Sequence, residues 1–144
     1  MSILDDLSSQ VSCYRRLAKL AEAQHDHVQQ SRTDDLLIVL TRRQEVIDQI
    51  FTLEQSIAPA KKQWGEFVAG LTPDDRASAE ALLSEAKLLL EQITTSDRAD
   101  AMILQQRKLN LGKQINQTGA ARQVNKTYAA AAYGKRPAGM DVQR

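Results

Sequence analysis

The chain has 144 residues, with 19 lysines and arginines against 18 aspartates and glutamates, so its formal net charge is +1. This length suits one domain, and six glycines and three prolines are too few for the frequent turns of a β-sandwich or β-barrel. Cys13 is the only cysteine, which excludes an internal disulfide and a zinc site built from several thiolates.

The first ten residues lack the basic start and the apolar stretch of a signal peptide. The longest run of large apolar residues covers 36–40, far short of the ~20 residues that span a bilayer. We therefore expect a cytoplasmic protein that does not insert into a membrane.

An apolar side chain recurs every three or four positions from Leu4 to Val28, which predicts a long helix, about 2–30, that packs as in a coiled coil. Leu17 and Leu20 widen this stripe, and Ser2 with Asp5 predicts a capping box at its start. The stripe consists of Leu4, Leu7, Val11, Tyr14, Ala18, Ala21, His25 and Val28.

A second helix is predicted over about 33–57, with Thr33 as its N-cap. Pro59 is expected to end it, because the residue before a proline avoids the helical region. Arg43 and Glu54 fall on the apolar stripe of this helix, so its face is less purely apolar. The apolar members are Leu36, Leu37, Leu40, Ile47, Ile50, Phe51 and Ile57.

A third long helix is predicted over about 73–130, since Thr72 followed by Pro73 is a strong helix start. We favour one continuous helix through 94–97, because no glycine or proline marks a turn there; a new helix that begins at Ser96 is the alternative. The connector over 60–71 has room for a short helix. Its apolar residues at near-helical spacing, which could close one end of a bundle, are Trp64, Phe67, Val68 and Leu71.

The expected fold is therefore all-α, an antiparallel helical bundle or coiled coil of three long helices, or four if the chain breaks at Ser96. We expect one domain over 1–134, followed by a flexible, disordered tail over 135–144. The heptad stripes fit a monomer and a homodimer equally well.

The last third of the chain differs in charge from the rest. Residues 101–144 hold eight lysines and arginines and one acid, Asp141, whereas residues 1–100 hold 11 bases and 17 acids. Large apolar residues become sparse after Ile115. This pattern predicts a helix-forming segment that becomes ordered when a partner supplies apolar surface, with a frayed helix end as the alternative.

Nothing in the sequence indicates catalysis. His25 and His27 lie two residues apart and face different sides of a helix, and the paired acids all fall at predicted helix starts, where the helix dipole explains them. Known hydrolase, zinc-protease and phosphate-loop motifs are absent. We expect no enzyme, no cofactor and no small-molecule substrate. Nucleic-acid binding is disfavoured because the basic residues are dispersed.

Four stretches together resemble the FlgN-type flagellar export chaperones. They are the heptad helix from Leu4 to Val28, the run Arg42–Ile50, the run Leu109–Gln117 and the ending Tyr128–Gly134. The resemblance covers about residues 1–135, and the Asn-rich last helix with its terminal Tyr-Gly is the most particular part. Residues 59–75 match no part of the family.

The resemblance implies a cytoplasmic chaperone that binds the helical terminal segment of hook-associated (hook-filament junction) proteins and delivers them to the export apparatus. It implies that the last helix, about 97–132, binds the substrate, and that a tyrosine, Tyr128 or Tyr133, docks on the cytoplasmic domain of the export gate. A coiled-coil scaffold or adaptor, and an RNA-binding helical protein, are the alternatives. The implied substrate residues are Leu104, Leu111, Gln114, Ile115, Gln117 and Val124.

Overall fold

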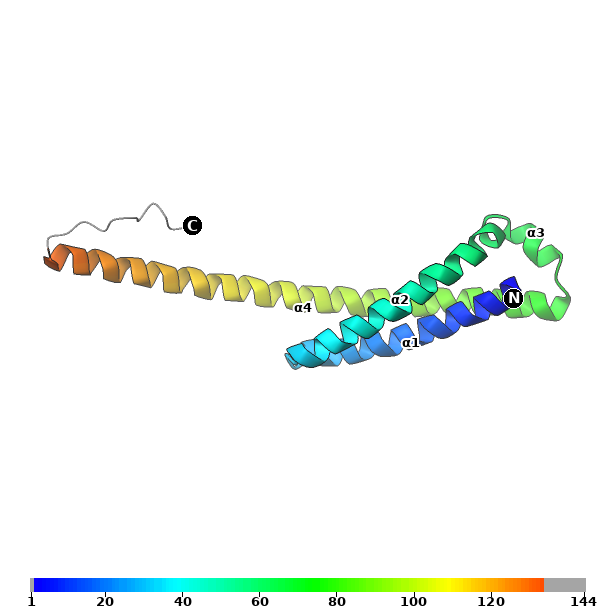
Figure 1. Cartoon of the computed structure of the whole chain (residues 1–144), viewed down its shortest axis with the longest axis horizontal. Coiled ribbons are helices and arrows are strands. Elements are labelled where there is room, and N and C mark those ends of the chain that lie inside the picture. The colour runs from blue at the N-terminus through cyan, green and yellow to red at the C-terminus, as the bar shows by residue number, and fades with distance from the viewer. Residues whose placement is uncertain (1, 134–144) are drawn as a thin grey trace. The chain divides into compact units, whose positions relative to one another are not determined.

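The computed structural model describes the backbone of residues 2–133 and the side chains up to residue 119. No strand occurs in this part of the chain, and three long helices are present, so the expected all-α fold is confirmed (Figure 1). Residues 135–144, predicted to be a disordered tail, lie outside the described residues. The helices are α1 (Ile3–Gln29), α2 (Thr33–Lys62), α3 (Trp64–Ala69) and α4 (Pro73–Tyr133).

The chain divides into two units, residues 1–103 and 104–144. The first unit contains α1, α2, α3 and the first part of α4, and Figure 1 shows α1 and α2 side by side. The second unit contains the remainder of α4. One helix therefore contributes to both units, and the single domain over 1–134 stays a prediction.

The starts of α1 and α4 follow the predicted capping chemistry. The Ser2 hydroxyl accepts a hydrogen bond from the backbone N–H of Asp5 at 3.1 Å, and the Thr72 hydroxyl accepts one from Asp75 at 3.2 Å. Each side chain satisfies a backbone donor that the first turn of a helix leaves unpaired. Pro73 is the first residue of α4, where its missing N–H costs nothing.

The turn between α1 and α2 corrects the prediction of Thr33 as an N-cap. Thr33 is the first helical residue, and the preceding Arg32 makes no capping bond with its side chain. Instead α1 ends in a Schellman motif, in which Ser31 takes a left-handed φ of 55°. The N–H of Arg32 then donates to the carbonyl of His27 at 2.9 Å, and that of Ser31 to Val28 at 3.2 Å. Backbone bonds therefore set this turn.

Pro59 does not end the second helix, because α2 continues to Lys62. A proline removes one backbone donor, and in the last turn this loses a single bond, to the carbonyl of Gln55. The prediction for 94–97 is confirmed, since α4 is continuous there. The buried positions Ile93 and Asp100 lie seven residues apart, so the inward stripe keeps its register across this stretch.

Two clusters of buried side chains form the core of the first unit. One contains Cys13, Leu17, Ala21, Val46 and Ile93, and so joins α1, α2 and α4. The other contains Leu7, Ile57 and Ala79. The partly buried side chains against this second cluster include Trp64, Phe67 and Leu71, so the connector closes that end of the bundle as predicted.

The apolar stripe predicted for α2 is partly wrong. Ile57 is buried and Ile50 is half-buried, but Leu37, Leu40, Ile47 and Phe51 are exposed. The inward face carries Val39 and Val46 instead, together with Arg43 between them. Helix α2 can turn this face toward the core because the guanidinium of Arg43 has charged and polar partners on the neighbouring helices. These partners compensate its removal from water.

Candidate functional site

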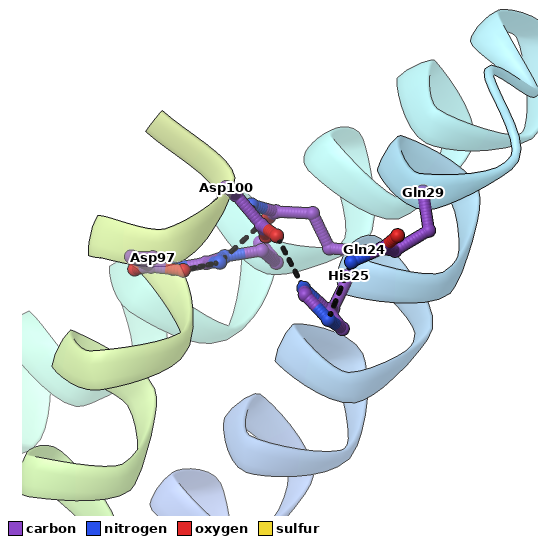
Figure 2. A network of polar contacts seen from close by, with 6 residues as sticks. Gln24, His25, Gln29, Asp97 and Asp100 are labelled. Carbon is purple, nitrogen blue, oxygen red and sulfur yellow. Dashed lines mark hydrogen bonds and ion pairs between the residues drawn. The ribbon is translucent and has the colours of Figure 1, made fainter. Parts of the chain in front are cut away.

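A network of polar side chains joins the three long helices within the first unit (Figure 2). Arg43 of α2 donates two hydrogen bonds to the Asp97 carboxylate of α4, at 2.7 and 2.8 Å, and one to the Oε1 of Gln24 at 2.6 Å. The Nε2 of Gln24 donates to one oxygen of Asp100 at 2.9 Å, and the Nδ1 of His25 lies 2.7 Å from the other. The two acids are three residues apart and so share one face of α4.

This network fixes the register of α4 against α1 and α2. Asp100 is only 1% exposed, and both of its oxygens have a partner. The hydrogen bonds with Asp97 raise the pKa of the Arg43 guanidinium, so this guanidinium stays charged. No buried polar side-chain atom of the described residues lacks a partner. We assign this network a structural role, with His25 as a polar residue in the seam between α1 and α4.

Two more polar contacts hold α1 against its neighbours. Gln10 donates to the Glu54 carboxylate of α2 at 2.7 Å, and Lys61 contacts the same group at 2.9 Å. Burial raises the pKa of Glu54, but these hydrogen bonds outweigh it and bring that pKa below its ordinary value. Arg15 of α1 also makes a bidentate ion pair with Glu85 of α4. All of these groups are occupied within the bundle, so we do not place a binding site on them.

The predicted substrate surface lies in the second unit, on α4. Leu104, Leu111 and Ile115 are between 43% and 61% exposed, although all three are large and apolar. Their spacing of seven and four residues places them on one face of the helix. We call these three residues the α4 apolar stripe.

The other implied substrate residues have different positions. Gln114 is exposed at the edge of the α4 apolar stripe, three residues from Leu111. Gln117 is exposed too, but it follows Ile115 by two residues and lies about 200° around the helix from it. The described structure therefore brings together Leu104, Leu111, Gln114 and Ile115, and places Gln117 on another face. The side chains of Val124, Tyr128 and Tyr133 lie outside the described residues.

The surroundings of the α4 apolar stripe are basic. Arg107, Lys108 and Lys113 are the charged side chains of residues 104–119, and no acid occurs there. Gly112 lies in the same stretch, and a Cβ atom built on it would meet no other atom within 4 Å. Helical spacing places Arg107 and Lys108 beside the α4 apolar stripe and Lys113 on the opposite side of the helix. The arrangement offers an exposed apolar strip, which suits an amphipathic helical partner.

The sequence did not point to the polar network. The spacing of two acids in α4 could have predicted it, because Asp97 lies four residues after Ile93 and Asp100 three residues after Asp97. Acids on an inward stripe require buried partners, and Arg43 was already noted on the stripe of the facing helix.

No family model, curated protein or solved structure matches the chain. Among residues 2–133, no helix is both long enough and apolar enough to cross a membrane. The resemblance to FlgN-type chaperones therefore rests on the sequence patterns, and location in the cytoplasm stays a prediction.

Proposed function

We propose that this protein is a FlgN-type flagellar export chaperone, which binds the helical terminal segment of a hook-associated protein through the α4 apolar stripe. The observation that carries the proposal is the exposure of Leu104, Leu111 and Ile115 on one face of a continuous helix. Exposed leucine and isoleucine at this spacing favour an apolar helical partner. The flagellar identity of that partner comes from the sequence resemblance.

The proposed mechanism needs no catalysis. Terminal helices of the exported proteins are amphipathic and would aggregate before assembly, so a chaperone covers their apolar face with a helix of its own. Ordering such a segment costs about 2–5 kcal/mol of the gross interaction free energy. The affinity is then moderate, and the substrate can be released at the export gate. Tyr128 or Tyr133 completes the proposal as the residue that docks on the gate.

A calorimetric titration of the full chain tests the proposal, with the last ~40 residues of each hook-filament junction protein of the same organism as ligand. We expect one-to-one binding that changes little between about 50 mM and about 200 mM salt, because apolar contacts dominate it. Leu111→Asp is expected to weaken binding by at least about 100-fold, since it places a charge in the contact.

Leu109→Asp is the matched control. Leu109 is 52% exposed against 58% for Leu111, on the same helix, but it lies two residues away and thus on the opposite side. We expect this variant to bind normally. Equal losses in both variants would contradict the placement of the site. No peptide binding, with strongly salt-dependent binding of single-stranded RNA, would favour the nucleic-acid alternative, and self-association alone would favour a scaffold.

A further inference from the structure

Helix α2 carries a second exposed apolar stripe, within the first unit. Leu37, Leu40, Ile47 and Phe51 are each between 39% and 65% exposed, and Gln44 occupies the position between them. The intervals are three, four, three and four residues, which is the a/d spacing of a helix that packs along another helix. We call these five residues the α2 outer stripe. It is distinct from the inward face with Val39 and Val46.

The α2 outer stripe has the pattern of a surface that matches itself. Gln44 is its midpoint, with Leu37 seven residues before and Phe51 seven residues after. Leu40 lies four residues before Gln44 and Ile47 three residues after it, so these two are symmetric about it to within one residue, about 1.5 Å along the helix. If a second copy of α2 runs antiparallel across it, Leu37 faces Phe51, Leu40 faces Ile47 and Gln44 faces its own copy. Every apolar residue then meets an apolar one, and the single polar residue meets an amide that can both donate and accept.

The charges beside the stripe fit the same arrangement. The solvent-facing edge carries Asp34, Thr41, Asp48 and Gln55, one per heptad. An antiparallel pairing about Gln44 brings Asp34 to within one residue of Gln55 of the second copy, and Asp48, which accepts a hydrogen bond from Gln44 of its own helix at 2.8 Å, to within one residue of Thr41. Each acid therefore meets a neutral hydrogen-bonding side chain, and no like charges face each other.

The ends of the α2 outer stripe are polar, and one exposed leucine of α4 lies on the helix face that contacts α2. Thr33 is the next residue in phase before Leu37, and Glu54, which is paired with Lys61, is the next after Phe51. On α4, Leu90 is 41% exposed and lies two turns before Asp97, whose carboxylate contacts Arg43 of α2. Leu90 therefore shares with Asp97 the face of α4 that contacts α2.

From these observations we propose that the α2 outer stripe binds the α2 outer stripe of a second copy of this chain, antiparallel and about a two-fold axis at Gln44. The resulting homodimer uses none of the residues of the α4 apolar stripe. It therefore goes beyond the proposed chaperone function, and the two proposals can fail separately.

Sedimentation of the full chain over about 1–200 μM is the first test, since this range covers dissociation constants from about micromolar to tenths of a millimolar. We expect a monomer–dimer equilibrium. Phe51→Asp is expected to raise the dissociation constant at least about 100-fold, because it faces an apolar residue in the dimer. Leu88→Asp is the control: Leu88 is 60% exposed against 65% for Phe51, but it lies on α4 beside the groove with His25. It should dimerise normally, and thermal melting should show both variants folded.

Cysteine cross-linking of the full chain tests the antiparallel direction. Gln44→Cys is expected to form a disulfide-linked dimer, because residue 44 meets its own copy. Phe51→Cys is expected to form no such dimer, because the two copies of residue 51 lie 14 residues apart along the helix pair, a distance of about 21 Å. The native chain is the control without an introduced cysteine, and it is expected to cross-link little because Cys13 is buried. A monomer at all concentrations, a dimer that persists in Phe51→Asp, or efficient cross-linking at 51 would overturn the proposal. Dissociation by Leu111→Asp instead would assign self-association to the second unit.

Discussion

At the scale of single residues, the bundle depends on charged groups that lie where apolar ones are expected. Arg43, Asp97 and Asp100 all occupy inward positions, and each has a hydrogen-bonding partner on another helix. Such groups contribute little net stability compared with apolar residues, but removal of one partner leaves a buried group without compensation. These groups instead specify how the three helices align, since their hydrogen bonds are all formed together in the observed register.

Asp100→Ala should destabilise the protein by about 2–4 kcal/mol, because the amide of Gln24 and the imidazole of His25 both lose their acceptor. Urea unfolding followed by circular dichroism measures the change. Asp26→Ala removes an exposed aspartate from the same bundle and should cost less than about 0.5 kcal/mol. Equal effects of the two substitutions would show that the buried network does not fix the bundle.

At the scale of elements, α4 combines two environments in one helix. Up to Ile103 its inward stripe is buried or half-buried, with Ala79, Ile93 and Asp100 most deeply enclosed. Residues 104–119 carry apolar residues at helical spacing but bury none of them. Local helix propensity must therefore hold this segment helical in the absence of a partner, and Gly112 and Gly119 weaken that propensity.

Gly112→Ala should stabilise the helix locally by about 1 kcal/mol, because alanine restricts the unfolded backbone and its Cβ meets no atom within 4 Å. The expected result is a higher helical content by circular dichroism, with slower amide exchange around residue 112. The unfolding midpoint of the first unit should not change. A lower helical content would mean that glycine is needed for a conformation other than the observed helix.

At the scale of the whole molecule, the two units differ in what stabilises them. The first unit has two clusters of buried side chains and polar contacts between helices. In the second unit, none of the described side chains of residues 104–119 is buried. Stability is therefore expected to be uneven along the chain, as it is wherever a segment has few buried contacts.

Amide hydrogen exchange of the full chain without a partner should separate the two units. Amides of Val11–Ala21 should exchange only through global unfolding, whereas those of 104–119 should exchange at least about 100-fold faster through local opening. Mass spectrometry of peptide fragments measures both. Equal protection would mean that residues 104–119 already have a packing partner. Addition of the helical segment of the proposed substrate should slow amide exchange in 104–119 and leave the exchange of Val11–Ala21 unchanged.

Much of the fold could be predicted because it follows from local chemistry. Ser2 and Thr72 mark helix starts through a hydroxyl that caps a backbone donor, and the heptad stripe of α1 has no competing phase. The errors fall where the chain offers two solutions. The turn at Ser31 uses backbone bonds in place of the expected Thr33 cap, and α2 tolerates Pro59 because only its last turn is affected.

The all-α class, the extent of the long helices within a few residues and the continuity of α4 could all be predicted, because they depend on periodicity, caps and propensity along one segment. Helical spacing alone also places Leu104, Leu111 and Ile115 on one face of α4. Which of the two stripes of α2 faces inward, in contrast, follows from packing between helices. That choice depends on whether Arg43 finds Asp97 and Gln24 across a helix contact, and such pairings between distant residues are not encoded in the period of either helix.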